Sequence, residues 1–125
     1  MAASRKLAPV TIRDATRADL TKFYGEPSKQ TVIARVGIVR GRLVGCGGVA
    51  YVAGVPFVFC DLKPSARRYK VTIVKAAAAL IDEIRAKGCR VMFADLDPDE
   101  QGAERWTKRM GFKPTAKPGR MKWLA

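Results

Sequence analysis

The stretch PFVFCDLKPSARRYKVTIVKAAAALIDEIRAKG, from Pro56 to Gly88, decides the fold. It opens with an apolar run rich in β-branched and aromatic residues, which predicts a buried strand over Pro56–Leu62. Pro64 stops the strand, and Ser65 suits the N-cap of a helix. That helix repeats apolar residues at spacings of three and four until Gly88 ends it. The stretch therefore predicts a strand followed by a long amphipathic helix.

The first turn of this helix carries Arg67, Arg68 and Lys70, although the helix dipole is positive there and favours anions. A bound anion would compensate, because free N–H groups and basic side chains would contact it together. A strand, a turn and a basic helix start form a known phosphate-binding geometry. The alternative is that these residues are solvated surface cations, and the sequence leaves both interpretations open.

The composition indicates one globular domain with a strongly basic surface. The chain has 125 residues, which suits a single domain over residues 1–125, and 48% of them are hydrophobic. It has 24 basic residues, 11 acidic residues and no histidine, and its net charge is +13. This balance implies anionic partners, such as nucleic acid, phosphates or an acidic protein surface, or else it serves only solubility.

Cysteine usage and hydropathy indicate the compartment. Cys46, Cys60 and Cys89 are odd in number and lack metal-ligand spacing, which predicts reduced thiols. The first residues lack the apolar core of a signal peptide, and no apolar run approaches the ~20 residues that span a bilayer. We therefore expect a cytoplasmic protein with no membrane partner.

The rest of the chain predicts short elements around the central strand and helix. The expected order is β-α-β-β-β-α-β-α-β-β, an α/β fold with a mixed sheet. Glycines in one of the hairpin strands indicate a bulge or the close approach of another segment. The expected elements are a strand at Val10–Arg13, a helix with a capping box at Thr16, strands at 31–40, 42–51 and 56–62, the long helix, a strand at 90–96, a helix from about Asp99 to Met110, and strands at 112–115 and 120–124.

This order, together with three phrases, resembles the GNAT superfamily of acetyl-CoA-dependent N-acetyltransferases. TIRDATRADL (Thr11–Leu20) is similar to the family's opening strand and helix, and GRLVG (Gly41–Gly45) to its hairpin turn. AERWTKRMGF (Ala103–Phe112) is similar to its last helix and the Gly-Phe that follows. The resemblance spans nearly the whole chain and implies a GNAT-like mixed sheet.

The resemblance also implies a site for acetyl-CoA. In the family, the central strand pairs with the pantetheine arm, and the loop after it holds the pyrophosphate together with the start of the long helix. The family signature there is Arg or Gln, two residues, Gly, one residue, then Gly or Ala. Arg67 fits this signature, whereas Lys70 and Thr72 stand where the small residues belong. The cofactor-binding residues implied for acetyl-CoA, coenzyme A or another phosphate-bearing anion are Leu62, Arg67, Arg68, Tyr69, Lys70, Val71 and Thr72.

The chemistry implied by the resemblance needs a base for the acceptor amine and a proton donor for the leaving thiolate. Asp61, at the end of the central strand, is the candidate base; the alternative is a solvated carboxylate or an ion pair with Lys63. Thr107 stands where the family often has a proton-donating tyrosine. The acceptor is unknown, and a basic surface favours an anionic one.

Two clusters of charge have simpler interpretations. Acidic residues at 95, 97, 99 and 100 suggest a calcium loop, but Glu100 and Trp106 stand where such a loop needs glycine and glutamate, so we expect no metal. The last segment is basic throughout, which indicates either a phosphate-backbone footprint or a solvated edge. Its cations are Arg105, Lys108, Arg109, Lys113, Lys117, Arg120 and Lys122.

Two functions follow. The first is a GNAT-like N-acetyltransferase with a degenerate cofactor loop. The second is a catalytically inactive GNAT-fold protein, because the short chain and ARRYK (Ala66–Lys70) also resemble the GNAT-like proteins of short-tailed bacteriophages. Such a protein would act in virion assembly, in the host cytoplasm or the virion, and would bind a phage structural protein or nucleic acid through its basic surface.

Overall fold

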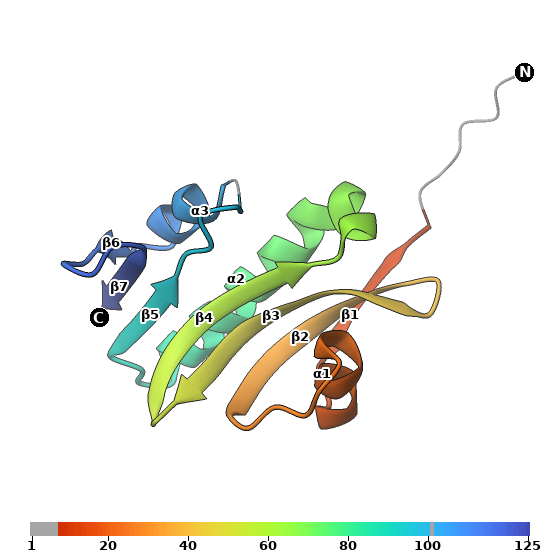
Figure 1. Cartoon of the computed structure of the whole chain (residues 1–125), viewed down its shortest axis with the longest axis horizontal. Coiled ribbons are helices and arrows are strands. Elements are labelled where there is room, and N and C mark those ends of the chain that lie inside the picture. Colours follow the sequence, from red (N-terminus) through yellow and green to blue (C-terminus); the bar gives the residue numbers. More distant parts are fainter. Residues whose placement is uncertain (1–7, 101) are drawn as a thin grey trace, which may run out of the picture.

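The computed structural model describes residues 8–100 and 102–125 as seven strands, three α-helices and one 3-10 helix (Figure 1). The order of elements confirms the predicted α/β class and the predicted sequence of strands and helices. The elements are β1 (Val10–Asp14), α1 (Arg17–Tyr24), β2 (Thr31–Val39), β3 (Arg42–Val52), β4 (Val55–Leu62), η1 (Pro64–Tyr69), α2 (Lys70–Ala86), β5 (Val91–Asp95), α3 (Ala103–Arg109), β6 (Lys113–Pro114) and β7 (Arg120–Leu124).

The strands form one mixed sheet in the order β1-β2-β3-β4-β5-β7-β6. Neighbouring strands are antiparallel except β4 and β5, which run parallel. In the described residues the β4–β5 register has a single position, Phe57 opposite Phe93. Beyond it the two strands diverge toward their carboxyl ends (Figure 1). The sheet therefore opens beside the last residues of β4.

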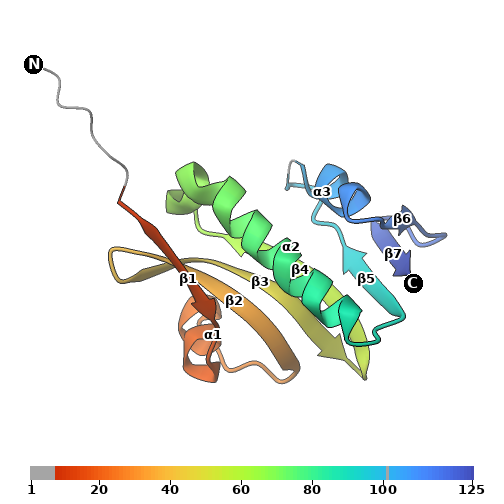
Figure 2. The ribbon, with the colours of Figure 1, turned by 180° about the vertical axis from the view of Figure 1, so that it is seen from behind.

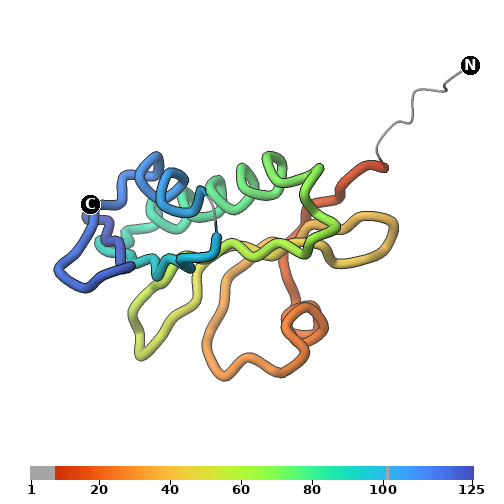
Figure 3. The backbone as a smooth tube through the Cα atoms, turned by 45° about the horizontal axis from the view of Figure 1, so that its top comes forward, coloured from red at the N-terminus to blue at the C-terminus, as the bar shows by residue number. Residues whose placement is uncertain are grey.

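Helices cover the two faces of the sheet unequally. α2 and α3 lie on one face, and α1 lies alone on the other, below β2 and β3 (Figures 2 and 3). On the α2 face, Leu80, Ile81 and Ile84 pack against β-strand residues such as Val49 and Met92. On the other face, Leu20 and Phe23 of α1 pack against Val36 and its neighbours. No helix in the described part of the chain is both long and apolar enough to cross a membrane.

Glycines in β2 and β3 allow α2 to sit close to the sheet. A Cβ at Gly45 would lie 2.9 Å from Ile73 Cγ2, and a Cβ at Gly47 would lie 2.7 Å from the Cβ of Ala77. Gly37, where the β2–β3 register shifts, faces the same Ile73 side chain. The close approach of α2 therefore explains Gly45 and Gly47 in β3, and it is one of the two alternatives that the sequence indicated for these glycines.

The first helix begins with the predicted capping box. The Thr16 hydroxyl accepts from the Asp19 backbone N–H at 3.1 Å, and the Asp19 carboxylate accepts from the Thr16 N–H at 2.7 Å. Arg13 also donates to Asp19, and this hydrogen bond holds the pKa of Asp19 well below its usual range. The backbone N–H groups of Thr16 and Asp19 at the helix start therefore both have hydrogen-bond acceptors.

Two helix starts differ from the prediction. The central helix begins at Pro64 as a 3-10 turn with Lys63 before it, so Ser65 lies inside the turn and is not the N-cap. The last helix begins at Ala103 instead of near Asp99. The Asp97 side chain accepts from the Asp99 N–H at 2.9 Å, and such local bonds compete with helix formation.

Candidate active site

A cleft of about 200 Å³ opens where β4 and β5 separate. One wall is the end of β4, from Val58 to Leu62, and the other is formed by the end of β5 and the start of α3. Lys70, the first residue of α2, closes one side. The backbone of β4 faces this cleft along an edge that β5 leaves open after Phe57. Such an edge can pair with an extended ligand through main-chain hydrogen bonds.

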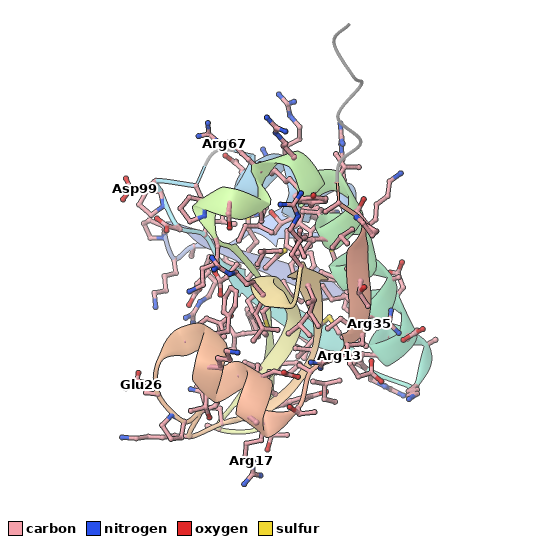
Figure 4. All side chains as sticks on the ribbon, turned by 90° about the vertical axis from the view of Figure 1, so that its right-hand side faces the viewer. Arg13, Arg17, Glu26, Arg35, Arg67 and Asp99 are labelled. Carbon is pink, nitrogen blue, oxygen red and sulfur yellow. The ribbon has the colours of Figure 1, made fainter. Side chains whose placement is uncertain are left out.

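The cofactor residues implied by the resemblance do not all meet in this cleft. Leu62 and Lys70 line it. Arg67 and Arg68 lie exposed on η1, and Figure 4 shows Arg67 on the outside of the molecule. Tyr69 packs against the cluster of Val44, Ala66 and Ile73. Val71 and Thr72 are exposed, Val71 to 67%. The structure therefore brings Leu62 and Lys70 together in the cleft wall, and the other five residues do not line the cleft.

The backbone at the helix start is not an open anion-binding loop. The Ala66 N–H donates to the Lys63 carbonyl at 2.8 Å, and the Lys70 N–H donates to the Arg67 carbonyl. A phosphate here would therefore depend more on the side chains of Arg67, Arg68 and Lys70 than on these N–H groups. The open β4 edge and this group of cations fit a phosphate-bearing cofactor of extended shape, although no glycine loop is present.

Lys70 reaches across the cleft toward α3. A Cβ added at Gly102 would lie 3.8 Å from the Lys70 ammonium nitrogen. Glu100, at the same end of α3, lines the cleft with it. The Lys70 side chain therefore extends toward the start of α3 and places a positive charge in the cleft wall.

Asp61 lies at the end of β4 and is exposed. Its Oδ2 accepts a hydrogen bond of 2.6 Å from the Tyr24 hydroxyl, which comes from the last residue of α1. Burial and this bond raise the pKa of Tyr24, so its hydroxyl stays protonated and remains a donor at neutral pH. Tyr24 and Asp61 lie 37 positions apart, so no local sequence signal predicts this hydrogen bond.

Lys63 does not pair with Asp61 as the alternative interpretation expected. Its ammonium donates to the Phe23 carbonyl at 2.9 Å and lies 4.4 Å from the centre of the Phe23 ring. A cation at the carboxyl end of α1 suits the helix dipole. Lys63 therefore fastens α1 to the end of β4, and the Asp61 carboxylate is bonded to Tyr24.

Thr107 lines the cleft, as expected for the position of the family's tyrosine, but its hydroxyl is engaged elsewhere. The side chain is 2% exposed, and its oxygen lies 3.0 Å from the Ala103 carbonyl and 2.9 Å from the Glu104 carbonyl. Its hydrogen is therefore donated within α3. Thr107 is a helix-stabilising residue here and is poorly placed to protonate a leaving group.

Two acidic residues that line the cleft, Asp95 and Asp97, have structural partners. Arg120 donates to both oxygens of Asp95, at 2.7 and 2.9 Å, and these bonds lower the pKa of Asp95. Asp97 caps the turn through the Asp99 N–H. Over the described residues no group of three or more histidine, cysteine, aspartate or glutamate side chains could hold a metal.

The cysteines are free thiols. Cys60 lines the cleft, and burial raises its pKa to about 12. Burial also raises the pKa of Cys46 to about 12. Both thiols stay protonated at neutral pH, so neither is an activated nucleophile.

Comparisons with known proteins give one consistent result. No protein-family model and no curated protein matches the sequence. The structure is similar to an N-acetyltransferase of Staphylococcus aureus Mu50, with a TM-score of 0.69 and 16% identity over 94% of this chain and 99% of that one.

Two further structures extend the comparison. YncA of Salmonella typhimurium, solved with its cofactor acetyl-CoA, gives a TM-score of 0.64 and 18% identity over 92% of this chain and 93% of that one. The ribosomal-protein-S18-alanine N-acetyltransferase of Escherichia coli gives 0.63 and 15% over 93% and 94%. At these identities the likeness shows the fold alone, and this chain has the GNAT fold.

Proposed function

We propose that residues 1–125 form one GNAT-like domain that transfers an acetyl group from acetyl-CoA to an amine. The observation that carries this proposal is the open edge of β4, which has Asp61 near its end, beside a cleft. The fold shared with N-acetyltransferases supports it as an analogy.

Different residues around the cleft would bind different parts of the cofactor. Leu62 and the edge of β4 would hold its extended arm, and Lys70 would hold its phosphates together with the exposed Arg67 and Arg68 of η1. Tyr69, Val71 and Thr72 would contribute through the same helix start. When bound, acetyl-CoA would supply an acetyl group activated as a thioester.

Asp61 would take the proton from the acceptor amine, because a carboxylate at the strand end can serve as general base. Tyr24 donates to one of its oxygens, which leaves the other for the amine. Thr107 donates its proton within α3, so the leaving group would take its proton from solvent.

Calorimetric titration of acetyl-CoA into the purified protein at physiological salt tests this proposal. We expect saturable binding in the micromolar range. The variant Arg67→Glu/Arg68→Glu should weaken binding by at least about tenfold, because two phosphate-facing cations become anions. Lys75→Glu, an exposed lysine further along α2, is the matched control and should bind as the wild type. No binding by the wild-type protein would contradict the proposal.

The alternative of an inactive bacteriophage assembly protein that binds a protein or nucleic acid is not favoured, because the structural matches include N-acetyltransferases. Two of the cations counted as a phosphate-backbone footprint are in ion pairs: Arg120 with Asp95, and Lys108 with Glu104. A reducing compartment such as the cytoplasm suits the three free thiols and completes the proposal.

A further inference from the structure

A second pocket lies on the α1 face of the sheet and meets the cleft at the end of β4. Phe59 and Asp61 line both spaces. The second pocket has a volume of about 470 Å³, within the range of small-molecule sites. Its walls include the apolar side chains of Leu20, Val32 and Ala50. A pocket with apolar walls and a polar rim at residues 26–30 therefore leads to the Asp61 carboxylate, which also lines the cleft.

The charges in this pocket differ in sign from those of the whole chain. Its ionisable side chains include the carboxylates of Glu26 and Asp61 and the ammonium of Lys29, a balance of two negative charges against one positive. The chain as a whole carries +13. Glu26 lies just after the end of α1, away from the sheet, in Figure 4, whereas Asp61 lies at the junction with the cleft. A cationic head group would therefore be attracted to the junction.

We propose that this pocket binds the acyl acceptor and that the acceptor is a monoamine with an apolar body. This inference rests on the proposed acetyltransferase function. The apolar walls would bury the body, and Asp61 would receive the ammonium group. The substrate class is thus opposite to the anionic acceptor that the surface charge favours.

Tyr24 has a positioning role in this arrangement. Its hydroxyl donates to Oδ2 of Asp61, so Oδ1 is left to face the amine. In the proton transfer, an N–H bond of the ammonium breaks and an O–H bond forms at Oδ1, while the electron pair stays on nitrogen. The free amine then has the lone pair that acyl transfer needs.

A panel of three amines tests the substrate class. The probes are 2-phenylethylamine, the polycation spermidine and the anionic amino acid glutamate, each assayed for thiol release from acetyl-CoA and each titrated calorimetrically without cofactor. We expect 2-phenylethylamine to give the highest kcat/KM and measurable binding. A higher kcat/KM for spermidine or glutamate would overturn the inference while leaving the acetyltransferase proposal standing.

Two leucine substitutions on β3 locate the binding site. Ala50→Leu adds bulk inside the pocket and should raise the KM and the dissociation constant for 2-phenylethylamine by at least about tenfold. Val52→Leu, on the same strand and face but outside the pocket lining, is the matched control and should leave both values unchanged. Equal effects of the two substitutions would overturn the assignment.

Tyr24→Phe separates positioning from packing. The ring stays and the hydroxyl is lost, so kcat for 2-phenylethylamine should fall about tenfold, because a hydrogen bond to a charged group is removed. KM should stay within about twofold, and a change confined to KM would contradict the positioning role. If no amine is acetylated, the acetyltransferase proposal fails, and the titration with Ala50→Leu alone decides whether the pocket binds the amine.

Discussion

The two edges of β4 differ, and the difference locates the site. Toward β3, the strand is paired over its whole length, from Val55 opposite Val52 to Leu62 opposite Gly45. Toward β5, the described register pairs only Phe57 with Phe93. β5 ends at Asp95, and the Leu96 N–H then donates to the Gly119 carbonyl at 2.8 Å. The strand is thus paired on both edges at its start, whereas its edge toward β5 is open at its end.

Removing the charge at the open edge should have the largest effect. Asp61→Asn keeps the shape of the side chain but removes the proton acceptor, so kcat for acetyl transfer should fall by about 10²–10⁴-fold. Thermal stability should change little, because Asp61 is exposed. Asp14→Asn, whose side chain is 87% exposed on β1, is the control and should retain activity. Unchanged turnover in Asp61→Asn would show that the open edge carries no base.

A substitution on β3, which pairs with β4 over the whole length of β4, should lower the stability of the fold. Gly47→Ala should cost about 1–3 kcal/mol of unfolding free energy, because the new Cβ would lie 2.7 Å from Ala77 Cβ and 3.2 Å from the Phe59 carbonyl. Urea denaturation measures this cost. In the double variant with Ala77→Gly, the loss should be smaller than the sum of the two single losses. Additive losses would mean that the two positions do not compete for space.

A substitution at the paired position of β4 and β5 should have an intermediate effect on stability and on binding. The rings of Phe57 and Phe93 lie 5.6 Å apart at the one paired position. Phe93→Ala should cost about 1 kcal/mol through the lost aromatic pair, in addition to the lost burial. It should also weaken acetyl-CoA binding, since the divergence of β4 and β5 starts there. Full binding with reduced stability would show that the cleft does not depend on the ring pair.

The smallest effect should come from the Asp95–Arg120 pair at the end of β5. Arg120 lowers the pKa of Asp95, so the pair stabilises the fold above the unfolded pKa of about 3.9. This contribution is lost as the pH falls through the folded pKa. Asp95→Asn should therefore have a slightly lower Tm than the wild type at pH 7, and the gap should narrow as the pH is lowered below the unfolded pKa. A gap independent of pH would exclude the ion pair as its source.

Local chemistry predicted much of the fold. Thr16 and Asp19 form the capping box, and the apolar period of α2 gave the helix that covers the sheet. The starts at Pro64 and Ala103 were missed, because hydrophobic periodicity does not show short-range hydrogen bonds such as the one that the Asp99 N–H donates to the Asp97 carboxylate.

The candidate site was only half predictable. Asp61 and Lys70 follow from strand–helix order, and both line the cleft. Tyr24 does not, because its bond to Asp61 joins segments 37 residues apart. The alternative of an ion pair between Lys63 and Asp61 was wrong for a related reason. Charge predicts this attraction, whereas the packing of α1 on the sheet brings the carbonyl and ring of Phe23 to the Lys63 ammonium.

Gly37 and Gly45, which lie beneath α2 and outside the cleft, help to set the width of the cleft. Ile73 sits in the space left by Gly37 and Gly45, three residues after Lys70 in the cleft wall. A methyl group at either glycine would push Ile73 and the start of α2 away from the sheet. This displacement would shift Lys70 relative to β4. If the cleft binds acetyl-CoA as proposed, substitutions in the sheet beneath the helix should therefore change its affinity, as should substitutions among the residues that line the cleft.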